Sequence, residues 1–354
     1  MDALPLSSSP PPPPLKGRAT TCNGHSELCS KLYSNVTYIG THNSYGIGNG
    51  TSNIAANQAQ SIATQLDAGI RMLQAQAHKS SNSSTTGIGV DLCHTSCSLY
   101  QGGAIENWLT QIKSWVDSNP NEVVSLLIIN SDSVAPSTYA QAFESTGLSS
   151  KMYSPSNPSS SGGVSKSSWP TLNYMIDSGK TVVAFLENNA DVSSISYLLP
   201  EFSSMWENPY DQISTPFNCS VDRSGQGEDT SSQMYLANHF LNTQSILGPY
   251  PNTGAIYATN SKLSVLTDMD NCASQHDSYP TFVLVDYYDQ PANDVFAAAA
   301  VMNGVSFTNS SSSSSSTSLK SSSDNTLRPW SSPASWSVGL ASTATLALAF
   351  AAFA

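Results

Sequence analysis

Short apolar segments rich in β-branched residues recur along this chain, and they limit its fold more than any other feature. Each is nearly continuous in hydrophobicity rather than alternating, which is typical of strands covered on both faces, as in a parallel sheet. The segments are VTYIG from Val36, IRMLQAQAH from Ile70, VDLCH from Val90, VVSLLIIN from Val123, TVVAFLE from Thr181 and TFVLVDYY from Thr281.

Helical patterns fill the intervals between these segments. NIAANQAQSIATQLDAG precedes the second segment, and AIENWLTQIKSWVDSNP precedes the fourth. In the latter, apolar residues recur at helical spacing, namely Ile105, Trp108, Leu109, Ile112, Trp115 and Val116. Strands that alternate with helices through residues 22–308 predict an α/β fold, either a (β/α) barrel or an open doubly wound sheet.

The two ends of the chain differ from this central part. Residues 309–335 form a Ser-rich linker that cannot build a core, and residues 336–354 are apolar. Small residues near Ser323, a polar spacer and this tail match a glycosylphosphatidylinositol attachment signal, with Ser323 as the expected site. Residues 1–21 are atypical, because they lack the apolar centre of a signal peptide; either a signal lies upstream or this segment replaces it poorly.

Cysteines and glycosylation sequons favour the secretory route and an extracellular location. The six cysteines form neighbouring pairs, expected as disulfides Cys22–Cys29, Cys93–Cys97 and Cys219–Cys272. Zinc ligation by Cys93, His94 and Cys97 is the alternative, although no second close pair completes a four-ligand set. The sequons place N-glycosylation at Asn35, Asn49, Asn82, Asn218 and Asn309.

The charge balance excludes several classes of function. A net charge of −12 and a pI of about 4.7 leave no basic surface for nucleic acid and no attraction to anionic lipid. Membrane association would therefore depend on the lipid anchor. GIGNG at Gly46 lacks the spacing and the Lys of a phosphate-binding loop, and no Gly-x-Ser-x-Gly nucleophile elbow is present in the sequence.

Two histidines end predicted strands and suggest proton transfer. His42 lies in THNSYG and His94 in DLCHTSC, so in a barrel both imidazoles would lie at the carboxyl-end face, where barrel enzymes place their active sites. Two such groups can cleave a phosphodiester, one as base toward an attacking hydroxyl and one as acid toward the leaving alkoxide. A purely structural role is the alternative for either histidine taken alone.

Five motifs in order, THNSYG, QLDAGIRMLQAQAH, LCHTSC, NPNEVVSLLIIN and FVLVDYYDQ, resemble the X-domain of phosphatidylinositol-specific phospholipase C in its secreted fungal branch, from Cys22 to Thr308. The resemblance implies an irregular (β/α)8 TIM-type barrel. It also implies attack of the inositol 2-hydroxyl on phosphorus, release of diacylglycerol and a cyclic inositol phosphate. By the same resemblance, His42 is the general base, His94 the general acid and Asp286 the carboxylate that orients His42.

Departures from the family pattern bear on metal and substrate. Gln74 and Gln76 stand where bacterial relatives have an Asp and an Arg and calcium-dependent relatives have acidic ligands. Too few charged ligands remain for calcium, so we expect metal-independent chemistry without a cofactor. Asn43 falls at a metal-ligand position of the calcium-dependent relatives. We expect Asn43, Gln74, Gln76, Glu187 and Arg71 to contact substrate.

The sequence thus favours a metal-independent phosphodiesterase that acts on a phospholipid or inositol phosphodiester. The alternative is a catalytically weakened or inactive binding protein, anchored at the cell surface on the same barrel, which the two glutamines would explain. A glycerophosphodiester or sphingomyelin-type enzyme is a weaker third reading, because such enzymes need an acidic metal cluster that this sequence does not show.

Overall fold

The computed structural model describes residues 19–49, 53–80, 87–246 and 248–307 of the 354-residue chain. The predictions for Asn82, Asn309, Ser323, the linker and the apolar tail lie outside these residues. Within the described part, no helix is both long enough and apolar enough to cross a membrane.

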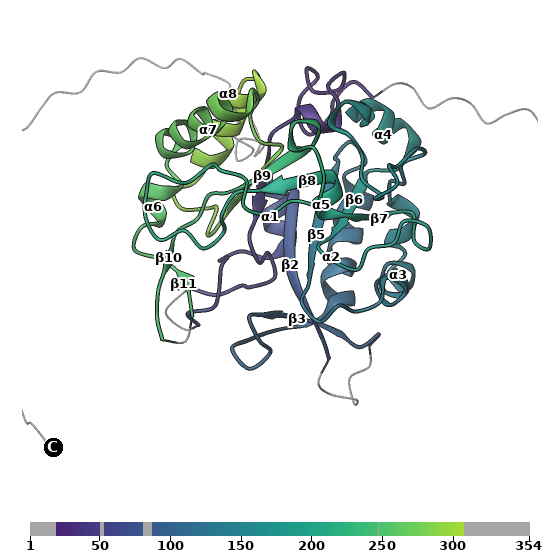
Figure 1. The fold of residues 1–354 in the computed structure, drawn as a ribbon, viewed down its shortest axis with the longest axis horizontal. Coiled ribbons are helices and arrows are strands. Elements are labelled where there is room, and N and C mark those ends of the chain that lie inside the picture. Colours follow the sequence, from purple (N-terminus) through teal and green to yellow (C-terminus); the bar gives the residue numbers. More distant parts are fainter. Residues whose placement is uncertain (1–18, 50–52, 81–86, 247, 308–354) are drawn as a thin grey trace, which may run out of the picture. The chain divides into compact units, whose positions relative to one another are not determined.

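A curled, mainly parallel sheet forms the centre of the fold (Figure 1). Its barrel strands run in chain order around the sheet, and every adjacent pair except β7 and β8 is hydrogen-bonded in parallel. They are β1 (Tyr38–Thr41), β2 (Met72–Lys79), β5 (Val124–Asn130), β6 (Val182–Leu186), β7 (Leu198–Pro200), β8 (Met205–Glu207), β9 (Met234–Asn238) and β12 (Phe282–Val285). Among the described residues β12 pairs with β1, whereas β7 and β8 do not pair, so this is an irregular (β/α)8 barrel with one open seam. The predicted fold class is confirmed.

The continuous hydrophobicity of the strands has a direct structural cause. In β6, Val183 and Phe185 pack in the cluster that fills the barrel, whereas Val182, Ala184 and Leu186 pack in the cluster between sheet and helices. Successive side chains of a strand point to opposite faces, and both faces are covered here. The whole strand must therefore be apolar, and all five of its residues are buried.

Helices surround the sheet (Figure 1). The α-helices are α1 (Ile62–Ala68), α2 (Ile105–Ser118), α3 (Pro136–Ser145), α4 (Leu172–Ser178), α5 (Glu201–Ser204), α6 (Ile256–Thr259), α7 (Lys262–His276) and α8 (Asp294–Asn303), with short 3-10 turns η1 (Tyr33–Asn35), η2 (Leu148–Lys151), η3 (Lys166–Ser168) and η4 (Thr230–Ser232). The amphipathic pattern of α2 is confirmed, since its predicted apolar residues are all buried. The α1 helix begins only at Ile62, where the Ser61 hydroxyl accepts a hydrogen bond from the Thr64 amide.

One predicted strand lies outside the barrel. VDLCH forms β3 (Val90–His94), which pairs antiparallel with β2 and with β4 (Tyr100–Ala104). It therefore extends β2 as a hairpin and is not the third barrel strand. A second hairpin joins β10 (Asn242–Thr243) to β11 (Tyr250–Pro251).

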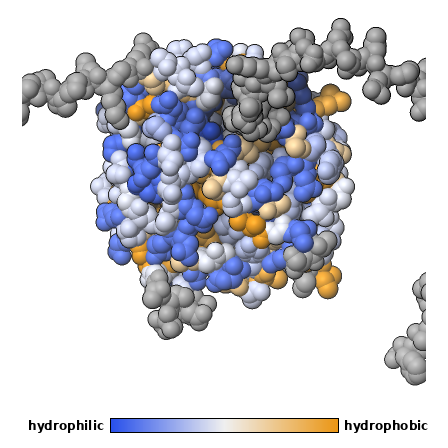
Figure 2. Space-filling view, turned by 180° about the vertical axis from the view of Figure 1, so that it is seen from behind, coloured by the Kyte–Doolittle hydropathy of each residue, from blue (hydrophilic) through white to orange (hydrophobic). Residues whose placement is uncertain are grey.

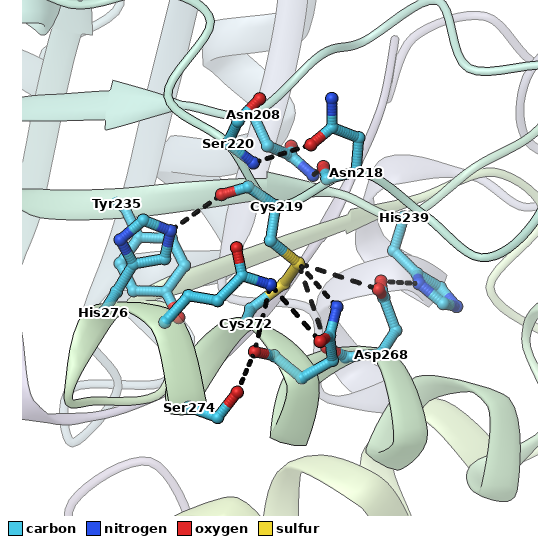
Figure 3. Close-up of a disulfide and its surroundings, with 12 residues drawn as sticks. Asn208, Asn218, Cys219, Ser220, Tyr235, His239, Asp268, Cys272, Ser274 and His276 are labelled. Atoms are coloured by element: carbon cyan, nitrogen blue, oxygen red, sulfur yellow. Dashed lines mark hydrogen bonds and ion pairs between the residues drawn. A yellow bond between two sulfur atoms is a disulfide. The ribbon is translucent and has the colours of Figure 1, made fainter.

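The structure contains the three expected disulfides, Cys22–Cys29, Cys93–Cys97 and Cys219–Cys272. The bond between Cys93 and Cys97 removes both thiolates that the zinc alternative required. Figure 3 shows that Cys219–Cys272 lies beside Asp268, which bonds to the buried His239. That disulfide fastens the loop after β8 to helix α7.

Candidate active site

The barrel strands carry polar side chains into a pocket at their carboxyl ends. In β1, Tyr38 packs inside the barrel, and the alternation of side chains brings His42 to the same face. The same alternation leads from Met72 to Gln74 in β2 and from Leu284 to Asp286 after β12. The apolar interior therefore ends in a polar layer, as at the catalytic end of other (β/α) barrels.

The register between β1 and β12 places His42 next to Asp286. Gly40 lies opposite Leu284 and Thr41 opposite Val285, so the next positions of the two strands adjoin. His42 Nδ1 lies 2.9 Å from Asp286 Oδ1, and the Asp286 side chain is 4% exposed. Because a carboxylate only accepts hydrogen bonds, Nδ1 carries the proton and Nε2 keeps its lone pair. That tautomer presents a base to the pocket.

Neighbouring side chains hold the His42 ring in place. Phe240 stacks on it with 4.2 Å between ring centroids and an interplanar angle of 2°. Asn57 Nδ2 donates to Asp286 Oδ1 at 3.0 Å. Asn43 Nδ2 lies 3.0 Å from His42 Nε2 and occupies the lone pair that a substrate hydroxyl would take. His42 thus has a fixed orientation, and its one basic nitrogen is hydrogen-bonded to Asn43.

His94 reaches the same pocket from the β3 hairpin. The two imidazole rings lie 5.9 Å apart, centroid to centroid, at 83°. His94 Nδ1 donates to the Ala55 carbonyl at 2.7 Å, so its Nε2 is the nitrogen left for proton transfer. Burial, and then the nearby His42, lower the pKa of His94. The two histidines lie close together as expected, although His94 lies on an antiparallel strand.

Gln74 and Gln76 position the loops that carry the histidines. Gln74 Oε1 accepts a hydrogen bond from the Asn43 amide at 2.6 Å. Gln76 Oε1 accepts one from the Thr95 amide at 2.7 Å, directly after His94. Both glutamines line the pocket, but each carbonyl oxygen already has a donor. Their structural role is therefore to fix the backbone next to each histidine.

A second wall of the pocket is built around Arg223. Its Nη1 lies 3.0 Å from Glu187 Oε1, and its Nη2 bonds to Glu207 Oε2. The guanidinium lies over the Tyr210 ring, 4.6 Å from its centroid. Burial raises the pKa of Glu187, an effect that the charge of Arg223 opposes. This wall offers hydrogen-bond donors and acceptors side by side.

The cavity between the two walls has a volume of about 350 Å³. Of its described lining residues only Arg223 is a lysine or arginine, whereas Glu187, Glu207 and Asp211 are carboxylates. The cavity is therefore more acidic than basic, and it suits a ligand with several hydroxyl groups better than one with several phosphates.

The structure brings most of the predicted site residues together, with one exception. His42, Asn43, Gln74, Gln76, His94 and Glu187 line the pocket, and Asp286 lies directly behind His42. Arg71 does not contribute. It precedes β2 at the opposite end of the barrel, where its Nη2 pairs with Glu122 at 2.7 Å and its guanidinium lies over Trp115. The expectation that Arg71 contacts substrate is corrected: it is an ion-paired residue at the amino end of the strand.

Several residues of the site carry no clear signal in the sequence. Asn57 lies in the segment interpreted as the beginning of a helix, although Asn-Gln ahead of the Ser61 cap is compatible with a loop. Arg223 and Glu207 lie in a region without an apolar run. An isolated antiparallel bridge brings them together, and no periodic pattern in the sequence predicts this bridge.

Comparisons with known proteins identify the family of this chain. The sequence model of the family described as PI-PLC X 1 matches residues 28–303. A protein of Arthroderma benhamiae named PI-PLC X domain-containing protein 1 is 36% identical over 291 residues, which cover 80% of this chain and 90% of that protein. An uncharacterized secreted protein of the same organism is 37% identical over 297 residues, covering 81% of this chain; the chain spans 64% of that relative's length.

Solved structures show the same fold. A variant of the phosphatidylinositol-specific phospholipase C from Staphylococcus aureus superimposes with a TM-score of 0.51 at 13% identity, covering 80% of this chain and 96% of that one. A second variant of that enzyme superimposes with a TM-score of 0.50 at 12% identity, covering 78% of this chain and 95% of that one. At such low identity the likeness concerns the fold alone.

Proposed function

Because this chain belongs to the family of phosphatidylinositol-specific phospholipase C X-domains, we propose that it is a phosphodiesterase that cleaves an inositol phospholipid by general acid–base catalysis. The observation that carries the proposal is the pair of fixed imidazoles facing one pocket, His42 backed by Asp286 and His94 backed by the Ala55 carbonyl. Both residues line the same pocket.

In the proposed reaction, the inositol 2-hydroxyl displaces Asn43 Nδ2 from His42 Nε2 and gives that nitrogen its proton, and the hydroxyl oxygen attacks phosphorus. The bond from phosphorus to the diacylglycerol oxygen breaks, and His94, which starts the reaction as the imidazolium, gives its Nε2 proton to the leaving alkoxide while Nδ1 keeps its proton on the Ala55 carbonyl. The products are diacylglycerol and a cyclic inositol phosphodiester. Asp286 stabilises the imidazolium that forms on His42, as a buried carboxylate behind a catalytic histidine does elsewhere.

The pocket also bears on metal. Glu187 and Glu207 are occupied by Arg223, and the Gln74 and Gln76 carbonyl oxygens are occupied by backbone amides. A hard cation such as calcium needs about six oxygen ligands, so this donor set fits it poorly. Among the described residues, the one group of three possible ligands is Cys219, Asp268 and Cys272, and its two cysteines are bridged. These contacts support metal-independent chemistry.

Exposed apolar residues around the pocket support a lipid substrate. Ile47, Ile54, Leu99, Ile213 and Ile246 are all at least 40% exposed, which is unusual for large aliphatic side chains grouped on one set of loops. The same loops carry pocket residues Asn43, Thr95, Asp211 and Pro249. Figure 2 shows that hydrophobic side chains are scattered over this face and that some lie at its lower edge, the edge where β3, β10 and β11 lie in Figure 1.

The proposed location is extracellular. Three disulfides fit an oxidising compartment, and one relative is named a secreted protein. Asn35, Asn49 and Asn218 are exposed, as glycosylation requires. Attachment of a glycosylphosphatidylinositol anchor at Ser323, after the barrel domain of residues 22–308, completes the proposal.

Phosphorus NMR of the glycosylated, tail-less protein with phosphatidylinositol in mixed micelles tests this function. The expected result is a cyclic phosphodiester signal that His42→Ala and His94→Ala both reduce by at least about a hundredfold in rate. An unchanged phosphatidylinositol signal with the wild-type protein would favour the binding-protein alternative.

A further inference from the structure

Glu201 is a buried carboxyl group without a hydrogen-bond donor. It begins the four-residue helix α5 in the open seam between β7 and β8, and none of its surface is exposed. Among the described residues neither of its side-chain oxygens has a donor partner. Glu207 is the neighbouring carboxyl group that, after burial, contributes most to raising the pKa of Glu201. Two ionised carboxylates could only repel one another there.

Glu207 connects Glu201 to the pocket. Its side chain is 2% exposed, and its Oε2 accepts hydrogen bonds from Arg223 and, at 3.3 Å, from Asn238. Arg223 in turn holds Glu187. Glu207, Arg223, Glu187 and Asn238 all line the cavity, whereas Glu201 lies behind them. The orientation of this wall therefore depends on Glu207.

If every ionisable group around Glu201 were charged, negative charges would outnumber positive ones. The titratable groups that face Glu201 are Glu207, Arg223 and Glu187, so three carboxylates would share one guanidinium. Burial, and then the charge of Glu207, raise the pKa of Glu201 well above its usual range. A proton on Glu201 removes the repulsion and supplies the missing donor, because a protonated carboxyl donates one O–H.

We propose that Glu201 is kept as a neutral carboxylic acid that donates a hydrogen bond to Glu207, and that it acts as a positioning residue for the Glu207–Arg223 wall that binds the polyol head group. The inference deepens the proposed function and rests on it for the identity of the head group. Glu201 touches neither substrate nor reacting atoms. The proton on Glu201 orients the side chain of Glu207, and Glu207 in turn orients Arg223 toward the cavity.

The sign of the pH dependence follows from the direction of the shift. Folding raises the pKa of this carboxyl group, so its contribution to stability is fully present at a pH below the pKa of the unfolded chain. This contribution is lost as the pH rises through the pKa of the folded protein. Ionisation of Glu201 at alkaline pH should therefore loosen the wall. The expected effect is weaker head-group binding, seen in KM rather than in kcat.

Infrared spectroscopy of the full glycosylated chain tests the protonation directly. The wild type should show the carbonyl band of a protonated carboxyl at neutral pH, far above the ordinary Glu pKa of about 4.3. Glu201→Gln should remove this band, and Glu144→Gln, which changes an exposed glutamate of α3, should not. Absence of the band in the wild type would overturn the proposal whether or not the protein hydrolyses lipid.

Calorimetric titration with myo-inositol tests the positioning role. Glu201→Gln retains a donor and cannot ionise, so it should bind as the wild type does and lose the alkaline weakening. Glu201→Leu removes the donor and should weaken binding about tenfold, the loss expected for one hydrogen bond to a charged group. Equal weakening in both variants, or none in Glu201→Leu, would overturn the positioning role. Failure to detect phosphodiesterase activity would leave the infrared result standing and count against the proposed function alone.

Discussion

His42 and Asp286 adjoin because β1 and β12 are parallel and in register, and the Nδ1 to Oδ1 distance of 2.9 Å continues the pairing of Gly40 with Leu284. The geometry of this residue pair is thus a property of two strands buried in the barrel. Any change that shifts one strand along the other would also separate the imidazole from its carboxylate.

Gly40 is where this register is most easily disturbed. A Cβ atom there would lie 2.5 Å from Leu284 Cδ2 and 2.9 Å from Met72 Cβ, so Gly40→Ala should overpack the barrel interior. We expect a loss of about 2 kcal/mol in the free energy of unfolding, measured by urea denaturation. Gly254→Ala is the matched control, because its Cβ would meet nothing closer than 3.6 Å. Equal stability of the two variants would contradict this packing.

Most of the fold could be predicted from such buried strands. Runs such as VVAFL are apolar at every position because both faces are covered, and this signal survives without any knowledge of tertiary structure. The strands β7 and β8 have three residues each, one of them ending in Pro200, and such short segments carry no recognisable period.

The site was predictable only where it continues a strand. His42, Gln74 and Asp286 lie at or just beyond the ends of recognisable strands, so their meeting follows from the parallel sheet. Arg223 is brought to the pocket by an antiparallel bridge to Glu207 across an irregular segment. Because that contact is set by the tertiary fold, local sequence could not reveal it.

The pH dependence of activity should report the environment of His94. Burial and His42 lower its pKa, so the proton needed by the leaving group is lost at a lower pH than for an ordinary histidine. In a plot of kcat/KM against pH, the midpoint of the alkaline limb should therefore lie below about pH 6.5. A phosphodiester with a phenol leaving group, which needs no acid, should lack this limb. A limb well above 7 for the lipid substrate would contradict the assignment.

Chelation should leave the reaction intact. The pocket carboxylates Glu187 and Glu207 are paired with Arg223, so they are not available to a divalent cation. We expect the rate of phosphatidylinositol cleavage to stay within about twofold in excess EDTA, since the proposed steps need no Lewis acid. Loss of activity in EDTA that calcium restores would show that these ion pairs open to bind metal.

The apolar loops around the pocket should bind a lipid surface. Ile246 is fully exposed and Ile213 is 54% exposed, so changing both to Ser should weaken binding to phosphatidylcholine vesicles. We expect roughly a tenfold loss for each residue, from the 1.5–3 kcal/mol of burying such a side chain. Tyr174→Ser in α4, at the upper edge in Figure 1, is the control for an exposed apolar residue away from the pocket. Equal vesicle binding by all variants would exclude these loops from membrane contact.

The roles of the two histidines can be separated by the choice of leaving group. His42→Ala and His94→Ala should each slow phosphatidylinositol cleavage by at least about a hundredfold, or roughly 3 kcal/mol in the barrier, with folding retained. Their effects should be far from additive, because a base without its acid is of little use. A phenol leaves without accepting a proton, so an inositol phosphodiester of a phenol should restore the rate of His94→Ala but not that of His42→Ala. Restoration of both variants, or of neither, would mean that the base and the acid are wrongly assigned, and full activity of His42→Ala would return His42 to a structural role beside Asp286.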